Sequence, residues 1–258
     1  MNNDTAYVTI KDRIATVILN NPSEGNIIDE GMASTLNAIF IKLNEDENIA
    51  VVVISATGPV FSIGRTQISS ELSIHERRQI LHDLNISDNL TRLRVPTIAS
   101  INGDAMEHGL EIALCADIRI CNTSTRFRCN DLYNGSAFPI DGGTQRLPRV
   151  IGTSWTMDML LTGRIVDAQE ALSIGLVNKV VKNDILENTT SELASLIASG
   201  ATIANQYAKE AVYSGMEINL TDGLRLETDL NVILQSTYDR SEGIKSFLEK
   251  RPPIFKGE

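Results

Sequence analysis

The 258-residue sequence predicts an α/β fold, with a parallel sheet in the first part of the chain and a helical last third. Two patterns lead to this prediction. Short β-branched runs bounded by polar residues alternate with stretches at helical spacing, which is typical of βαβ units with right-handed crossovers. After "GGTQRLPRVIG" (142–152) nearly every segment looks helical, and only "LVNKVV" (176–181) predicts a brief strand.

The first elements along the chain are predicted to be a hairpin, a helix and a buried strand. The stretch "AYVTIKDRIATVILNNP" (6–22) alternates and then becomes β-branched, with "KD" as the turn, so it predicts two paired strands. Apolar residues recur at helical spacing in "EGMASTLNAIFIKLNED" (30–46), and the apolar run "IAVVVISAT" (49–57) predicts a buried strand. Further strands are expected at "TIASING" (97–103) and "ADIRICN" (116–122), with helices between them.

Four segments predict the helical last third: "SWTMDMLLTG", "DAQEALSIG", "ILENTTSELASLIASGATIANQYAKEAVYSG" and "LTDGLRLETDLNVILQST". Their apolar content favours packing against other elements or other subunits. We expect a core of residues 1–195 and a C-terminal helical region of residues 196–258, without a Pro/Gly-rich linker between them.

The charge and the cysteines argue against several classes of protein. Asp and Glu number 33 against 23 Lys and Arg, and the formal net charge of -10 argues against binding to nucleic acid. The three cysteines, Cys115, Cys121 and Cys129, form no C-x-x-C pair, which argues against a zinc site or a disulfide framework and favours a reducing cytoplasm. Neither a secretory signal nor an apolar run of membrane-spanning length is present, so no membrane association is expected.

Two glycine-containing turns follow predicted strands, at the edge where open α/β proteins usually bind ligands. They are "GPVFSIGRTQ" (58–67) and "NGDAMEHGLE" (102–111). Backbone N–H groups at such turns can hold the oxyanion of a thioester enolate, although ordinary strand-to-helix turns have the same glycine spacing. A third segment, "GSAFPIDGGTQRL" (135–147), matches neither a phosphate loop nor a dinucleotide fingerprint, so ATP and nicotinamide are not favoured ligands.

Five segments in colinear order resemble the enoyl-CoA hydratase/isomerase family, also called the crotonase superfamily. They are "FSIGRTQ", "VPTIASINGDAMEHGLEIALCADIRI", "RFRCNDLYNGSAFPIDGGTQRLPRVIG", "LLTGRIVDAQEALSIGLVNKVV" and "EGIKSFLEKRPPIFKG", and they span nearly the whole chain. The resemblance implies a crotonase-like spiral of ββα units with a helical C-terminal region. It also implies a homotrimer or homohexamer assembled through the C-terminal helices, and an acyl-CoA thioester as substrate.

The resemblance further implies which groups hold the substrate. Two main-chain N–H donors polarise the thioester carbonyl in this family, and by motif they fall on Arg65 and His108. The matching substrate-binding positions are Ile63, Gly64, Gly109 and Gly135. Lys250 lies in a basic tail similar to one that contacts CoA phosphates in the family, often from a neighbouring subunit; a solvated charged end is the alternative.

Three acids are candidates for proton transfer. Glu111 stands where hydratases of the family have a Glu, and Asp131, in "FRCND", stands at their second acidic position. Two carboxylates suit hydration, because one orients or deprotonates water while the other delivers a proton. A loop or capping role is the alternative for Asp131. Asp141, in "PIDGG", lies where isomerases, dehalogenases and carbon–carbon hydrolases of the family have a catalytic Asp, so the second acid is Asp131 or Asp141.

The sequence departs from the family pattern at both oxyanion loops. The familiar "FSAGADL" is "FSIGRTQ" here, and Gly-Gly-Gly is "EHG", so Glu107 and His108 stand where the family keeps no side chain. A side chain there narrows the acyl pocket, points outward or takes part in the reaction, and histidine has an unperturbed pKa near neutrality that suits an acid/base. The segment 67–94 is expected to fold over the pocket and set the acyl group.

The favoured hypothesis is an acyl-CoA lyase that hydrates a 2-enoyl-CoA to a 3-hydroxyacyl-CoA. No metal or redox cofactor is expected, because the thioester itself acidifies the carbon beside it, and CoA is part of the substrate. One alternative is a double-bond isomerase or a carbon–carbon hydrolase that uses Asp141 or His108. The other is a non-catalytic acyl-CoA-binding protein.

Overall fold

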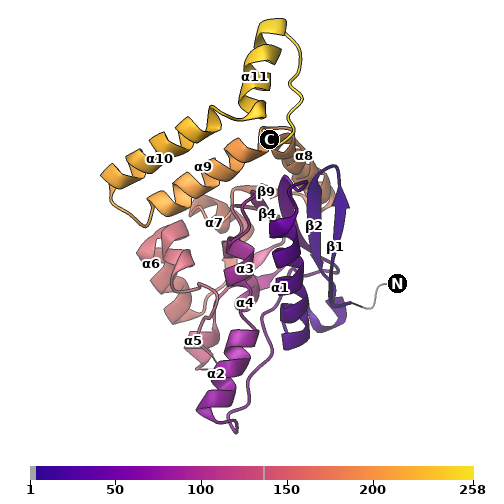
Figure 1. Ribbon diagram of the computed structural model, residues 1–258. Helices are drawn as coiled ribbons and strands as arrows, with labels where there is room; N and C mark the ends of the chain where they lie inside the picture. The colour runs from indigo at the N-terminus through magenta and orange to yellow at the C-terminus, as the bar shows by residue number, and fades with distance from the viewer. Residues whose placement is uncertain (1–3, 136) are drawn as a thin grey trace.

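The computed structural model describes residues 4–135 and 137–258, which form two β-sheets with helices packed around them (Figure 1). Within these residues the larger sheet has six strands in the order β1-β2-β3-β4-β6-β9. All neighbouring pairs in it are parallel except β1 and β2, which are antiparallel. The strands are β1 (Ala6–Lys11), β2 (Ile14–Leu19), β3 (Val51–Ala56), β4 (Thr97–Ile101), β6 (Ile118–Asn122) and β9 (Lys179–Val181).

The helices of the first two thirds of the chain connect these strands or follow the third glycine-rich segment. They are η1 (Pro22–Glu24), α1 (Glu30–Glu45), α2 (Ile74–Asp83), α3 (Ser87–Thr91), α4 (His108–Cys115), α5 (Asp131–Asn134), α6 (Arg146–Thr162) and α7 (Ala168–Ser173). The remaining helices are η2 (Asn183–Ile185), α8 (Leu186–Ala198), α9 (Thr202–Gly215), α10 (Leu220–Leu234) and α11 (Tyr238–Glu249). Within the described residues, no helix is both long and apolar enough to cross a membrane.

The strands at the centre of the larger sheet are buried on both faces. In β3, Val52 and Ile54 join a cluster with α1, α3 and α4, whereas Val51 and Val53 join a second cluster with α8. This division follows from the alternation of side chains along a strand. The prediction of a buried parallel sheet with helices on its faces is confirmed, and Figure 1 shows α1 and α8 on opposite sides of it.

The predicted hairpin is present, but its turn lies one residue later than "KD". Lys11 pairs with Ile14, so the turn residues are Asp12 and Arg13. Both have positive φ angles, 50° and 67°, which is the conformation of a type I′ turn. This turn matches the right-handed twist of the two strands, and the twist therefore decides the register.

A smaller sheet of three very short strands was not predicted from the sequence. It has the order β5-β7-β8, from β5 (Ala105–Met106), β7 (Arg126–Arg128) and β8 (Val166–Asp167). Strands of two or three residues are too short to show a period of two. This sheet matters because β5 leads directly into α4, and β7 leads into the segment that contains Asp131.

The long helical stretch predicted between residues 185 and 215 is two helices. α8 ends at Ala198 and packs on the larger sheet, and α9 begins at Thr202. α9 and α10 then extend beyond the sheets, with α11 further out (Figure 1). A hydrogen bond from Arg13 Nη2 to Thr202 Oγ1 (2.8 Å) and an ion pair between Lys209 and Asp117 (3.0 Å) attach α9 to the rest of the molecule.

The two glycine-containing turns that follow β3 and β4 lie against each other. Asp104 O accepts from the amides of Phe61 (3.0 Å) and Ser62 (3.2 Å), and Ser62 O accepts from the amide of Met106 (2.9 Å). Gly109 lies so close to this contact that a Cβ atom there would stand 2.4 Å from Ser62 O. The glycine is therefore required by the close approach of two backbones.

We expect Gly109→Ala to lower the free energy of unfolding by about 3 kcal/mol, because the new methyl group meets backbone atoms that cannot rotate away. Urea denaturation measures this loss. Gly31→Ala is the matched control, since Gly31 is exposed in α1 and its added Cβ would meet nothing closer than 3.4 Å. Equal stability of the Gly109→Ala variant and the wild type would contradict the close approach.

Candidate active site

The amides of Arg65 and His108 lie on the two turns that contact each other. Arg65 forms an isolated parallel bridge with Ile28, in which Gly64 O accepts from Ile28 N and Thr66 N donates to Ile28 O. The alternation of a strand therefore directs the Arg65 amide away from Ile28. His108 is the first residue of α4, where amides have no partner within the helix. Neither amide donates to an acceptor among the described residues.

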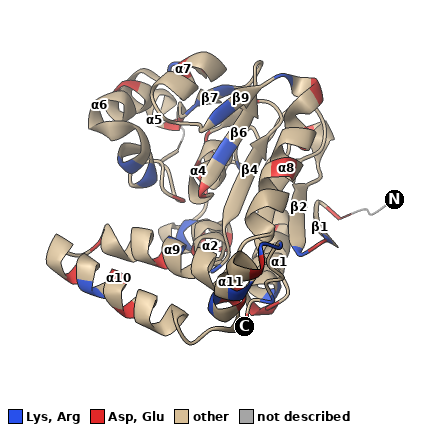
Figure 2. Ribbon diagram, turned by 90° about the horizontal axis from the view of Figure 1, so that it is seen from above, with Lys and Arg blue, Asp and Glu red and all other residues tan. Residues whose placement is uncertain are grey.

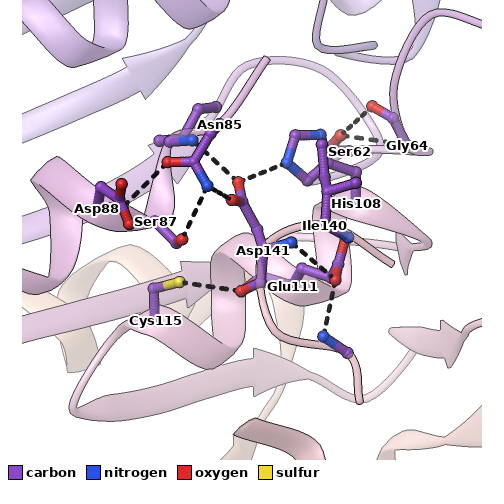
Figure 3. A network of polar contacts seen from close by, with 12 residues as sticks. Ser62, Gly64, Asn85, Ser87, Asp88, His108, Glu111, Cys115, Ile140 and Asp141 are labelled. Carbon is purple, nitrogen blue, oxygen red and sulfur yellow. Dashed lines mark hydrogen bonds and ion pairs between the residues drawn. The ribbon is translucent and has the colours of Figure 1, made fainter. Parts of the chain in front are cut away.

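Glu111 lies in the first turn of α4, and its carboxylate is buried beneath the segment 140–143. It accepts from the amides of Ile140 (3.3 Å), Asp141 (3.1 Å) and Gly143 (2.7 Å) (Figure 3). Glu111 is only 3% exposed, and this burial raises the pKa of its carboxyl group. A Cβ atom at Gly143 would stand 3.1 Å from Glu111 Oε1, so the glycine makes room for the carboxylate.

Asp141 is fully enclosed and bonded on both of its oxygens. Oδ1 accepts from Asn85 Nδ2 (2.5 Å), and Oδ2 accepts from the amide of Ile86 (3.0 Å) and contacts His108 Nε2 (2.7 Å) (Figure 3). Burial acts to raise the pKa of Asp141, but the hydrogen bond and the charge of His108, with the amide of Ile86, hold this pKa below its ordinary value. Asp141 is therefore an ionised group held inside the protein.

The side chain of His108 points into the protein interior. It is 1% exposed, its Nε2 contacts Asp141, and its Nδ1 has no hydrogen-bond partner among the described residues. The neighbouring cavities are not lined by His108. Its side chain thus neither narrows the cleft nor points outward.

Glu107 has a backbone conformation that side chains rarely adopt, with φ 50° and ψ −121°. Such a conformation costs about 1–3 kcal/mol in a residue other than glycine. Its carboxylate accepts from the amides of Asn130 (2.6 Å) and Asp131 (3.1 Å) and pairs with Arg128 Nε (3.2 Å). Burial raises the pKa of Glu107, and the nearby charge of Asp131 adds to this effect. Glu107 thereby holds the start of α5.

A cleft made of two adjoining cavities opens beside these residues. The cavities have volumes of about 450 Å³ and 570 Å³, and four residues line both: Arg65, Thr66, Gln67 and Asp131. The first cavity extends under α2 and along Phe138–Ile140, and the second extends past Glu107 to the loop of Asn21–Asp29. Asp131 thus faces the cleft, whereas Glu111 and Asp141 lie behind Ile140.

A model of the enoyl-CoA hydratase/isomerase family matches residues 9–258. The chain belongs to this family. It is 34% identical to the "probable enoyl-CoA hydratase, mitochondrial" of Dictyostelium discoideum, over 97% of this chain and 90% of that protein. It is also 34% identical to the "(E)-benzylidenesuccinyl-CoA hydratase" of Thauera aromatica, over 96% and 97% of the two chains. The crystal structure of an enoyl-CoA hydratase from Bacillus anthracis has a TM-score of 0.94 to it, with 32% identity, and covers 98% of this chain and 100% of that one.

These likenesses confirm the predicted crotonase-like α/β fold and the prediction of an enzyme of the enoyl-CoA hydratase/isomerase type, a family that acts on acyl-CoA thioesters. The other positions implied by the resemblance are spread over the molecule. Ile63 and Gly64 line the 570 Å³ cavity, Gly109 lies at the contact between the two turns, and Gly135 follows α5 with φ 64°. Lys250 ends α11 and lines neither cavity of the cleft within one chain.

Sequence reasoning missed most of the residues that hold the candidate acids in place. Asn85 and Ile86 lie in the segment 67–94, which carries no motif, and they act on Asp141 through one side chain and one amide. Arg128 pairs with Glu107 through its side chain. Ile140 and Gly143 donate to Glu111 through their amides. A main-chain donor leaves no signal in the residue type. Among the described residues, no group of three potential ligands could hold a metal ion.

We expect Asp141→Asn to lower the free energy of unfolding by about 3 kcal/mol at pH 7, because it removes a buried charge that three donors satisfy. The pKa of Asp141 is lowered in the folded protein, so its stabilisation is complete above the ordinary aspartate pKa, about 3.9, and is lost as the pH falls through the native pKa. Urea denaturation at several pH values should show the difference from wild type shrinking below about pH 4. Asp184→Asn, at an exposed position, is the control, and an Asp141→Asn variant as stable as wild type at pH 7 would contradict this account.

Strain at Glu107 predicts an inverted order of two substitutions. Both Glu107→Gly and Glu107→Ala remove the carboxylate, but only glycine adopts the observed φ of 50° without strain, so the Gly variant should be the more stable by about 1 kcal/mol. Thermal or urea denaturation of the two variants measures this difference. At exposed Lys42 in α1, the Ala variant should instead be more stable than the Gly variant. If the Ala variant is the more stable at both sites, Glu107 is not strained.

Proposed function

We propose that the chain hydrates a 2-enoyl-CoA to a 3-hydroxyacyl-CoA. The observation that carries this proposal is the pair of unbonded amides, Arg65 N and His108 N, on two turns in contact, with Glu111 three residues further along α4. Two amides directed at one oxygen stabilise the enolate that forms when the thioester is attacked. The amides act through the main chain, so the side chains of Arg65 and His108 remain available for other roles.

In the proposed reaction, the oxygen of water bonds to C3 and the double bond opens, so that negative charge develops on the carbonyl oxygen of the thioester. A proton is then added to C2 and the carbonyl group is restored. Glu111 as a carboxylate accepts a proton from the attacking water, and Asp131 at the cleft takes part in delivering the proton. The raised pKa of Glu111 favours such proton transfer near neutral pH. The thioester supplies the acidity of C2, so the proposal needs no metal or redox cofactor.

Asp131 has better support than Asp141 as the second acid. Asp131 lines both cavities of the cleft. Asp141 and Glu111 are both enclosed, but contacts with His108 and Ile86 lower the pKa of Asp141 whereas the pKa of Glu111 is raised, so Asp141 is the poorer proton donor. The same contacts weigh against the isomerase or carbon–carbon hydrolase that would use Asp141 or His108 on the substrate. We propose that Asp141 and His108 position the backbone around Glu111 instead.

We also propose that residues 196–258 form a C-terminal assembly region for a homotrimer or homohexamer, distinct from the core of residues 1–195. The support is a set of exposed apolar side chains on α9, α10 and α11, which project from the sheets (Figure 1). They include Val212, Leu220, Leu224, Val232, Ile233, Phe247 and Leu248, and Met216 directly follows α9. Lys250 lines neither cavity of the cleft in its own chain, so we propose that it contacts CoA phosphates bound to a neighbouring subunit. Three buried free cysteines fit a reducing compartment such as the cytoplasm.

Glu111→Gln tests the reaction. We expect it to lower kcat for 2-enoyl-CoA hydration about 10²- to 10⁴-fold, because the amide cannot accept a proton from water. Loss of the conjugated enoyl-thioester absorbance, with mass spectrometry of the product, measures the rate and shows whether one water is added. Glu47→Gln, at an exposed position, should leave kcat unchanged. Double-bond migration without added water would favour an isomerase, and equal turnover by Glu111→Gln and wild type would exclude the proposed role of Glu111.

A further inference from the structure

Two arginines that form no ion pair among the described residues line the 450 Å³ cavity. Arg65 comes from the turn after β3, and Arg77 comes from α2. In the part of the chain that the structure describes, neither is among the residues that form ion pairs. The side chain of Arg65 donates to Thr66 O at 3.5 Å, which is long for a hydrogen bond. Two cations therefore face this cavity with most of their donors available.

The other walls of this cavity are largely apolar. Leu81, Phe138, Pro139 and Ile140 line it, and the amide of Ile140 donates to the carboxylate of Glu111. The cavity thus extends from α2 to Ile140, and Glu111 lies behind Ile140.

The charge of this cavity differs from that of the adjoining one. Among the described residues that line the 450 Å³ cavity, the charged ones are Arg65, Arg77 and one acid, Asp131. Among those that line the 570 Å³ cavity, Arg65 is the one cation beside four acids, Glu24, Asp29, Glu107 and Asp131. Acidic and basic residues are otherwise dispersed over the helices and strands (Figure 2), and the chain carries a net charge of -10. Attraction for an anion is therefore local to the cavity beneath α2.

We propose that Arg65 and Arg77 bind a carboxylate at the far end of the acyl group, so that the substrate is the CoA thioester of an unsaturated dicarboxylic acid. Guanidinium groups bind carboxylates through paired N–H donors, which gives direction as well as strength. This inference rests on the proposed hydration, since it assigns the cavity beside Glu111 to the acyl group. The CoA phosphates are the other anions of such a substrate, and the experiment separates the two.

The test compares two 2-enoyl-CoA thioesters of equal chain length, one ending in a methyl group and one in a carboxylate. For the wild type we expect kcat/KM to be at least about 10-fold higher with the carboxylate, since a hydrogen bond to a charged group contributes about 1.5–3 kcal/mol. Arg77→Gln should lower the ratio of the two kcat/KM values about 10- to 100-fold. Arg78→Gln is the matched control, because Arg78 is the next residue of α2, is also exposed and does not line the cavity.

Two other outcomes overturn the inference. A wild-type ratio near one, or one that favours the methyl group, excludes carboxylate recognition. An equal loss for both substrates in Arg77→Gln assigns Arg77 to the CoA phosphates that the substrates share. If neither thioester is hydrated, the proposed function fails, and the ratio of the two dissociation constants from calorimetry, in wild type and in Arg77→Gln, then decides the inference independently. Arg65 is left unchanged because its amide belongs to the proposed oxyanion site.

Discussion

The contact between the turns after β3 and β4 is the constraint on which the rest of the site depends. The two strands are parallel neighbours, so their carboxyl ends meet at one edge of the sheet, and the turns exchange main-chain hydrogen bonds there. The contact leaves no room for side chains at Gly103 and Gly109, whose Cβ atoms would stand 2.0 Å from Pro59 O and 2.4 Å from Ser62 O. Because α4 begins at this contact, the contact fixes the His108 amide, the Arg65 amide and the start of the helix that carries Glu111.

A second constraint follows from the spacing of His108 and Glu111. Residues three apart lie on the same face of a helix, and this face of α4 packs against the segment 140–143. Glu111 binds the main chain of that segment, while His108 binds the side chain of Asp141 within it. The amides of this segment satisfy the buried carboxylate of Glu111, whereas Asn85, Ile86 and His108 satisfy the buried carboxylate of Asp141. The buried histidine has a structural purpose that a glycine at position 108 would not serve.

The sequence was sufficient for the sheet and the long helices, because β3, β4 and α1 have the apolar periods that buried strands and amphipathic helices require. It was not sufficient for the smaller sheet, whose strands are too short to show a period, or for the turn at Asp12–Arg13, where strand twist decides. At the candidate site, motif positions led to Glu111, Asp131 and Asp141. The sequence could not show that Asp141 is enclosed, since its enclosure depends on Asn85 and Ile86, more than 50 residues away and without a motif.

Glu107 and His108 are neighbours in sequence, but their side chains act on different parts of the site. Glu107 reaches the amides at the start of α5, where Asp131 faces the cleft, and His108 reaches Asp141 behind Glu111. One short stretch of backbone thus connects all three candidate acids. The strained conformation of Glu107 costs about 1–3 kcal/mol, which its two amide hydrogen bonds and the Arg128 ion pair offset. Side chains at these two positions therefore tie the acids to the turn that carries the His108 amide, a coupling that a run of glycines cannot provide.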